Sequence, residues 1–391
     1  MLRSFLLKGG IFLAFEQYLQ RGRQKLRCGY TTGACAALAA KAAAKMLLTQ
    51  QMAQEETLVL PKGLAVTVPI EEAAFSPSFA SCAVRKDGGD DCDATHGLLI
   101  YARVSPCAHP GVEIDGGQWV GRVTRPGLDQ PVGAAAINST PRRMIRQLVE
   151  KEVAGAGYSG GLSILISAPE GTALAEHTFN PRLGIEGGIS ILGTSGIVRP
   201  MSEAALIDSL YLEQDMAKAA GVEDLLVTPG NYGDAFAEQM LGLDLTDRCT
   251  CSNYLGHAID HAAGLGFRSL LLVGHLGKLI KVAAGSMNTH SKVADGRRET
   301  LTAHAALAGG SPALLKALFD CPTTDAGVEL LKEAGLLEQV MASIAQALEE
   351  VLRHRAGPDL AIEAVFFSNQ HGLLGKTTGA DKLLALHRNG R

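Results

Sequence analysis

The sequence lacks the features that mark nucleic-acid-binding, fibrous or disordered proteins. Of its 391 residues only 19% are charged and 5% are aromatic, with a single tryptophan, and no internal repeat or low-complexity tract occurs. The formal net charge of −4 gives no general attraction to nucleic acid or to an anionic membrane surface. We therefore expect neither among the partners, and any anionic ligand must be held by local clusters of basic residues.

Long apolar runs and paired cysteines are also missing. No stretch reaches the roughly 18 uninterrupted apolar residues of a transmembrane helix. The apolar N-terminal stretch is interrupted by Lys8 and Glu16, and no small-residue cleavage site follows, which disfavours a signal peptide. The eight cysteines form no CxxC pair, whereas structural zinc sites usually need two such pairs. We expect free thiols, no protein-bound metal and a cytoplasmic location.

What the sequence does contain predicts two domains after an N-terminal extension at residues 1–24. A chain of this length usually exceeds one core, and 47% hydrophobic residues with 45 glycines describe a compact, loop-rich enzyme. Residues 25–205 predict an α+β domain, with an alanine-rich helix at 34–48 and β-like runs at 58–68, 98–104 and 162–168.

Residues 206–391 predict an α/β, Rossmann-like domain with a parallel sheet and C-terminal helices. Strands and helices alternate here, which is typical of a doubly wound sheet. The expected strands are residues 224–228, 269–273 and 364–368; the expected helices are residues 202–220, 254–264, 324–336 and 338–354, with a further helix from Lys278.

Two glycine loops of this second domain follow expected strands and precede helices. They comprise residues 229–233 and 274–277, and glycine loops at this position hold cofactors at the carboxyl edge of a doubly wound sheet. The candidate residues are Gly230, Asn231, Gly233, Gly274 and Gly277. Neither loop has the GxGxxG pattern, so packing turns without a ligand remain an alternative. A segment resembling a phosphate loop, residues 371–377, has Gln370 where the motif requires glycine, which disfavours a nucleotide triphosphatase.

The first domain contains a possible anion-binding loop and an acidic loop. Thr31 and Thr32 lie between two glycines directly before the helix, where they could bind an anion or simply cap the helix. Residues 87–97 gather four aspartates and one histidine. We expect Asp93 or His96 to contact the substrate or take up a proton, although turn formation alone also favours such a composition.

Basic residues are concentrated in two stretches that are nearly free of acids. Residues 119–147 hold five arginines, including Arg122 and Arg125, against one aspartate. Residues 270–298 hold five basic residues, including Lys278 and Arg297, against Asp295. Because guanidinium groups bind carboxylates through two hydrogen bonds, these stretches suit a ligand with several carboxylates. An ordinary solvated surface is the alternative for any one of them.

Several long motifs resemble the CbiD-type cobalt-precorrin-5B C1-methyltransferases. They include LRCGYTTGACAALAAKAA from residue 26, GDDCDATHG (89–97), GRVTRPGL (121–128), EGGISILGTSGIVRPMSEAA (186–205), PGNYG (229–233), CSNYLG (251–256) and the segment 270–299. The resemblance covers residues 25–375 and leaves residues 1–24 outside. It implies a CbiD-like two-domain architecture and methylation of cobalt-precorrin-5B at C1, to give cobalt-precorrin-6A in anaerobic cobalamin biosynthesis.

The resemblance also implies the reactants and their contacts. S-adenosylmethionine is the implied methyl donor, with the second domain as its expected site, and the cobalt belongs to the corrinoid substrate rather than to the protein. The implied substrate-binding residues are Thr31, Thr32, Arg122, Arg125, Arg199, Lys278, Asn288, His290 and Arg297, with Asp93 and His96 as catalytic candidates. The alternative function is a non-catalytic tetrapyrrole carrier of the same pathway. The oligomeric state stays open.

Overall fold

The computed structural model describes residues 15–21, 23–60 and 63–388, which form two compact units: unit 1 ends at Ser202 and unit 2 begins at Glu203. Most of the predicted N-terminal extension, residues 1–14, lies outside the described residues. Its last part forms β1 (Tyr18–Arg21), which pairs antiparallel with β2 (Gln24–Arg27). This hairpin crosses the expected boundary at residue 24.

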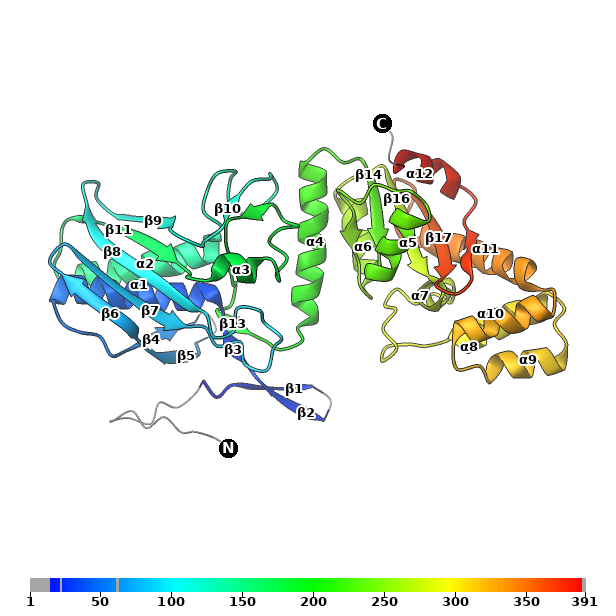
Figure 1. Cartoon of the computed structure of the whole chain (residues 1–391), viewed down its shortest axis with the longest axis horizontal. Coiled ribbons are helices and arrows are strands. Elements are labelled where there is room, and N and C mark those ends of the chain that lie inside the picture. Colours follow the sequence, from blue (N-terminus) through cyan, green and yellow to red (C-terminus); the bar gives the residue numbers. More distant parts are fainter. Residues whose placement is uncertain (1–14, 22, 61–62, 389–391) are drawn as a thin grey trace. The chain divides into compact units, whose positions relative to one another are not determined.

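Unit 1 is built on a mixed five-stranded sheet (Figure 1). Its order is β6 (Glu71–Ser76), β7 (Phe79–Arg85), β8 (Leu99–Cys107), β11 (Gly161–Ser167) and β9 (Val112–Gly116). Only β9 and β11 pair in parallel. The predicted strands at 98–104 and 162–168 are confirmed as β8 and β11.

A central helix, α1 (Thr32–Thr49), fills the core of unit 1 and confirms the helix predicted at 34–48. Its alanines are fully buried, because their small side chains let the helix pack closely against β7, β8 and α2 (Ser139–Gly155). Beside it lie β4 (Glu55–Val59) and β5 (Ala65–Pro69), an antiparallel hairpin where the sequence predicts one run at 58–68.

Short elements complete unit 1. They are β3 (Gly29–Tyr30), which pairs with β13 (Ile197–Val198); β10 (Arg122–Val123), which pairs with β12 (Ile185–Glu186); and α3 (Gly171–Ala175). The β3–β13 pair brings the two ends of unit 1 together directly before the N-terminus of α1.

Unit 2 contains a second five-stranded mixed sheet, ordered β15 (Cys249–Thr250), β14 (Asp224–Thr228), β16 (Ser269–His275), β17 (Ala361–Ser368) and β18 (Gly372–Lys376). The first four strands are parallel and β18 is antiparallel. All three strands predicted here are confirmed. The segment resembling a phosphate loop is itself the strand β18.

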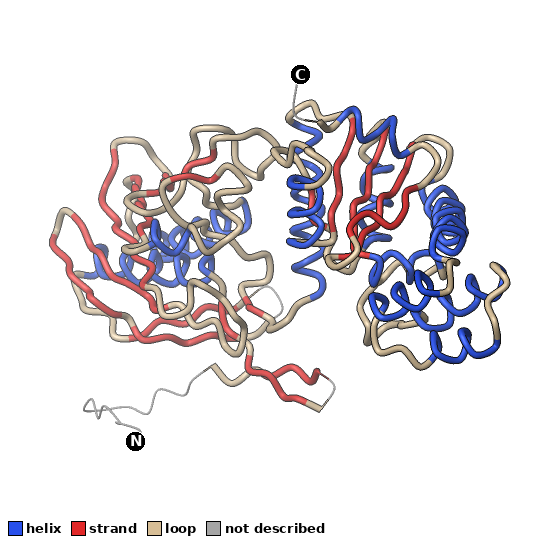
Figure 2. Tube along the Cα trace, turned by 45° about the vertical axis from the view of Figure 1, so that its right-hand side comes forward, coloured by secondary structure: helices blue, strands red, loops and turns tan. Residues whose placement is uncertain are grey.

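Helices cover both faces of this sheet (Figure 2). Side chains alternate along the strands, so that Leu225 and Leu226 enter different apolar clusters. The cluster of Leu226 includes residues of α5 (Asn231–Gln239) and α12 (Ala380–Leu386). The cluster of Leu225 includes residues of α6 (Leu255–Gly264), α7 (Leu276–Ala283) and α11 (Leu337–Ala356).

The remaining helices of unit 2 are α4 (Glu203–Ala219), which packs on α6, and α8 (Arg297–Leu307), α9 (Pro312–Phe319) and α10 (Thr324–Glu333), which pack on one another. The helices predicted at 202–220, 254–264, 324–336 and 338–354 are confirmed, whereas α8 and α9 were not predicted. Among the described residues no helix is both long and apolar enough to cross a membrane.

Candidate functional site

The acidic loop of residues 87–97 packs backbone against backbone on the segment before α1. The amide of Tyr30 donates to the carbonyl oxygen of Asp87 at 2.9 Å, and the amide of Asp90 donates to the carbonyl oxygen of Arg27 at 2.9 Å. A Cβ on Gly29 would lie 2.2 Å from the Asp87 carbonyl oxygen, and one on Gly89 would lie 2.3 Å from that of Arg27. Glycine is therefore required on both sides of this contact.

Ionic contacts reinforce this packing. The Arg27 guanidinium forms two hydrogen bonds with the Asp87 carboxylate, one of them 2.8 Å long, while the Arg27 amide donates to Oδ2 of Asp90 at 2.6 Å. Burial acts to raise the pKa of Asp87, but the hydrogen bonds from Arg27 and from the Gly89 amide outweigh it and hold that pKa below its ordinary value. Asp87 is thus a structural anion.

Asp93 has a buried lysine as its partner. Nζ of Lys86 lies 2.7 Å from Oδ2 of Asp93, and the lysine side chain is only 1% exposed. The other carboxylate oxygen, Oδ1, accepts from the amide and the hydroxyl of Thr95 at 2.8 and 2.5 Å. Burial acts to raise the pKa of Asp93, but Lys86 and Thr95 together hold it below the ordinary value. A carboxylate so fully bonded is a weak base.

His96 differs from Asp93 in exposure. Its side chain is 57% exposed, and its Nδ1 accepts a hydrogen bond from the Gly88 amide at 3.0 Å. This contact assigns the proton of the neutral ring to Nε2. The exposed edge of His96 therefore presents a hydrogen-bond donor, which can hold a carboxylate or carbonyl oxygen. Catalytic roles for Asp93 and His96 stay predictions.

The two threonines of residues 26–43, the signature segment of the family resemblance, have partners inside the fold. Oγ1 of Thr31 caps α1 by accepting from the Ala34 amide at 3.2 Å. Oγ1 of Thr32 accepts from the Leu192 amide at 3.0 Å and donates to the carbonyl oxygen of Ser190 at 3.1 Å. The described contacts thus join the N-terminus of α1 to residues 190–192. Substrate contact through these hydroxyls stays a prediction.

The predicted arginines of unit 1 differ in how far they are already paired. Arg122 forms a bidentate pair with Asp115 at 2.9 and 3.1 Å, so much of its charge is neutralised. Arg125 is exposed, lies with its stem against Gly184, and has no ion pair or hydrogen bond with any described residue. Arg199 is also exposed and, within the described chain, has no such partner. Of these three predicted arginines, Arg125 and Arg199 are therefore the two whose charge is available to an anionic ligand.

In unit 2 the two segments predicted as glycine loops lie side by side at the carboxyl edge of the sheet. Residues 229–233 span the junction between β14 and α5, whereas residues 274–277 are not a loop, because β16 runs directly into α7 and includes Gly274, while Gly277 lies in the first turn of α7. The strands β14 and β16 are parallel neighbours, and a Cβ on Gly274 would lie 3.2 Å from Cγ of Pro229. Gly230 has φ +140° and ψ −167°, a conformation that favours glycine. A Cβ on Gly233 would lie 2.9 Å from the Val273 carbonyl oxygen, so this glycine lets α5 approach the sheet.

Polar side chains line the same edge. Nζ of Lys278 donates to the carbonyl oxygen of Ser252 at 3.1 Å and of Pro229 at 3.4 Å, and burial lowers the pKa of this lysine. His275 accepts from the Gly277 amide at 3.0 Å and, through burial opposed by Asp325, also has a lowered pKa. Lys278 thus brings a half-buried positive charge to the point where the two segments meet.

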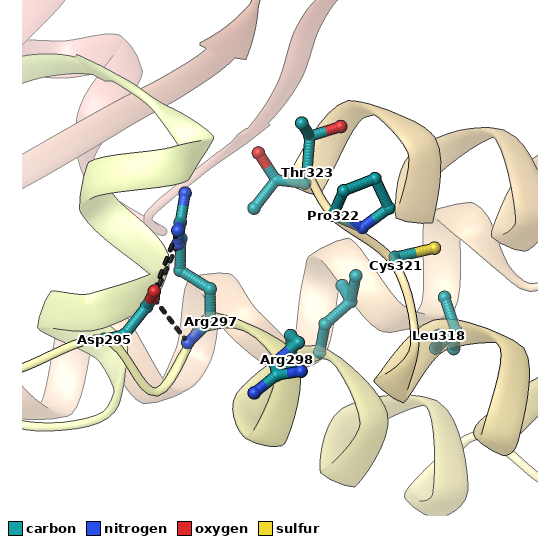
Figure 3. Close-up of a pocket in the computed structure, with 9 residues that line it drawn as sticks. Asp295, Arg297, Arg298, Leu318, Cys321, Pro322 and Thr323 are labelled. Atoms are coloured by element: carbon teal, nitrogen blue, oxygen red, sulfur yellow. Dashed lines mark hydrogen bonds and ion pairs between the residues drawn. The ribbon is translucent and has the colours of Figure 1, made fainter. Parts of the chain in front are cut away.

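Two of the predicted residues, Asn288 and His290, lie in the turn-rich segment between α7 and α8, and Arg297 is the first residue of α8. Oδ1 of Asn288 accepts from the His290 amide at 3.0 Å, and Nδ1 of His290 accepts from the Lys292 amide at 3.0 Å. Arg297 pairs with Asp295 at 2.6 and 2.8 Å and lines a pocket between α8 and α10 (Figure 3). The structure therefore groups Arg297 with that pocket, while the binding roles of all three stay predictions.

Some residues of these sites were not singled out from the sequence. Lys86, Arg27 and Thr324 were missed. For Lys86 a signal existed, because the alternation of β7 places buried Cys82 and Val84 on the same side as residue 86. In the described part of the chain, no group of three or more His, Cys, Asp or Glu residues could hold a metal ion.

Comparison with known proteins identifies the family. The family model described as CbiD matches residues 19–200, and the model described as CbiD, C-terminal domain, matches residues 288–378. The chain belongs to the CbiD family. The expectation that the resemblance begins at residue 25 is wrong, because the family match begins at residue 19. Residues 18–21 form β1, which pairs with β2 and so belongs to the same structural element as the matched residues after 24.

Curated relatives in this family carry one name. The proteins of Photorhabdus laumondii and Ruminiclostridium cellulolyticum, each named cobalt-precorrin-5B C(1)-methyltransferase, are 45% identical over 96% and 90% of this chain and 99% and 92% of their own. The Citrobacter koseri protein of that name is 42% identical over 95% of this chain and 98% of its own. A solved structure, the cobalamin biosynthesis protein CbiD of Archaeoglobus fulgidus, is 28% identical and covers 72% of this chain and 87% of its own, with a TM-score of 0.39.

Proposed function

We propose that this chain methylates cobalt-precorrin-5B at C1, with S-adenosylmethionine as the methyl donor. The observation that carries the proposal is the identity of 42–45% with relatives of that name over at least 90% of this chain. The similarity includes both units, so it concerns a whole enzyme rather than one shared domain. The cobalt enters with the substrate.

The carboxyl edge of the unit 2 sheet is the proposed donor site. We propose that residues 25–205 and 206–391 are the two domains of the enzyme and that the second domain is Rossmann-like. Support comes from four parallel strands and from the two neighbouring strand-to-helix junctions, β14 to α5 and β16 to α7, that contain Gly230, Asn231, Gly233, Gly274 and Gly277. Ligands of open α/β sheets bind at such an edge. Lys278, between the two junctions, can bind the donor's carboxylate or that of the substrate.

The corrinoid is proposed to bind through its carboxylate arms. Arg125 and Arg199 carry charges that no described residue neutralises. His96, elsewhere in unit 1, presents an N–H without a partner among the described residues. Methyl transfer from a sulfonium breaks one carbon–sulfur bond as the carbon–carbon bond at C1 forms, and the sulfur leaves as a neutral thioether. The protein therefore needs to align two bound molecules and exclude water rather than to supply a strong base.

The deciding experiment incubates the purified chain with cobalt-precorrin-5B and S-adenosylmethionine and follows the mass of the corrinoid. We expect a gain of one methyl group, with label transferred when the donor methyl is isotopically marked. A carrier would bind the corrinoid and leave its mass unchanged. Calorimetric titration with the demethylated donor separates the two functions independently, because a carrier has no need of a donor site.

A further inference from the structure

A pocket in the helical part of unit 2 combines two arginines with the first turns of two helices (Figure 3). Arg297 and Arg298 begin α8, while Thr323 and Thr324 form the start of α10. Figure 3 shows Asp295 with Arg297 on one side of the hollow and Thr323 on the other. Asp295 is the one acid among the lining residues, which also include apolar side chains.

Backbone amides add to the positive character of the pocket. At the start of α10, Oγ1 of Thr323 accepts from the Ala326 amide at 3.2 Å, and the amides of Thr324 and Asp325 have no partner among the described residues. At the start of α8, the Arg298 amide likewise has none there. Two helix N-termini that meet at one hollow favour an anion with oxygen atoms.

The side chains show which positive charge is available. Arg297 is neutralised by its bidentate contact with Asp295. Arg298 has no carboxylate partner among the described residues, and its guanidinium lies 5.1 Å from the centre of the Phe319 ring, which orients it. Thr324 is only 6% exposed, and its hydroxyl has no hydrogen-bond partner within the described chain. Thr324 is thus a largely buried residue that lines the pocket with a hydroxyl free of protein partners, and Arg298 adds an exposed, unpaired guanidinium beside it. Together they can bind the oxygen atoms of an anion.

The size of the pocket limits what that ligand can be. Its volume is about 220 Å³, which lies below the roughly 300–1,000 Å³ of sites that enclose a whole drug-sized molecule. The pocket therefore suits one group of a larger ligand. Oγ1 of Thr324 lies 3.4 Å from the position that a Cβ on Gly277 would take, so the pocket adjoins the carboxyl edge of the sheet.

We propose that this pocket binds one carboxylate of a reactant, held by Arg298, Thr324 and the free amides of α10. The proposal rests on the proposed function for the identity of the reactants. Both bring this chemistry: the corrinoid through its carboxylate arms and the methyl donor through its amino-acid carboxylate. In either case the pocket fixes a remote part of the molecule, so it contributes to binding rather than to the chemical step.

The test compares Arg298→Ala, Arg298→Lys and Thr324→Val with Lys332→Ala, which removes an exposed charge from the far end of α10. Dissociation constants are measured for cobalt-precorrin-5B by absorbance titration and for S-adenosylmethionine by calorimetry. We expect Arg298→Ala to raise one of the two constants about tenfold or more, Arg298→Lys to recover part of the loss, and Lys332→Ala to change neither.

Each outcome decides the proposal. A rise for the corrinoid alone identifies an arm of the macrocycle, and a rise for S-adenosylmethionine alone identifies the donor carboxylate. If Arg298→Ala and Thr324→Val leave both constants unchanged while melting curves match the wild type, the pocket binds no reactant carboxylate. If the wild type transfers no methyl group, the proposed function fails, whereas the binding constants still decide the pocket.

Discussion

The buried Lys86–Asp93 pair allows a quantitative prediction for the acidic loop. In Asp93→Asn, the Lys86 side chain, which is 1% exposed, loses its carboxylate partner. Removing one partner of a buried pair costs about 3–5 kcal/mol, and because Asp93 is 21% exposed we take the lower end, about 3 kcal/mol. Lys86→Met should cost less, since Asp93 keeps its hydrogen bonds from Thr95.

The assay can report on unit 1 alone, because the single tryptophan of the chain, Trp119, lies in that unit. We expect urea unfolding followed by tryptophan fluorescence to show about 3 kcal/mol lost in Asp93→Asn, and a melting temperature lower by roughly 6–12 °C. Glu71→Gln is the matched control, since it breaks the more exposed pair with Arg85 and should cost at most about 1 kcal/mol.

A double variant isolates the interaction. Lys86→Met combined with Asp93→Asn removes both charges, so its loss of stability should be smaller than the sum of the two single losses. Because the pKa of Asp93 is lowered in the fold, its ionisation stabilises the protein above the ordinary carboxyl pKa, and this contribution is lost as the pH falls through the folded value. Additive losses, or a cost for Asp93→Asn equal to that of Glu71→Gln, would refute the reasoning.

Two further predictions concern the reactants. Arg125→Ala should raise the KM for the corrinoid about tenfold with little change in kcat, because a rim carboxylate is held alike in ground and transition states; an effect confined to kcat in steady-state assays contradicts this. Gly230→Ala should weaken the binding of S-adenosylmethionine, measured by calorimetry. The control is Gly221→Ala, at the other end of β14, where φ is +87°; this variant should lower stability without changing the affinity for S-adenosylmethionine. Equal affinity in both variants would remove Gly230 from the donor site.

The helices and strands could be predicted from the sequence more fully than the ion pairs of the candidate sites. Strands β14, β16 and β17 followed from alternation with helices, and α1 followed from its alanines and its cap. The charges within residues 119–147 indicated five arginines and one acid. The partner of Arg122 is Asp115, which lies just outside that stretch and pairs with the arginine in the folded chain. A charge balance along the sequence cannot include such a contact, so Arg122 looked as available as Arg125.

The signature segment has structural partners within unit 1. Its glycine and threonines could have formed an anion site, yet Gly29 packs on the acidic loop and the hydroxyl of Thr32 joins residues 190–192. A residue already bonded inside the fold must break a contact before it can hold a ligand, whereas Arg125 and Arg199 pay no such cost. We therefore predict that Arg125 and Arg199, rather than the threonines, hold the ligand in unit 1. The signature segment supports Arg199 through the β3–β13 pair, which ends directly before this arginine.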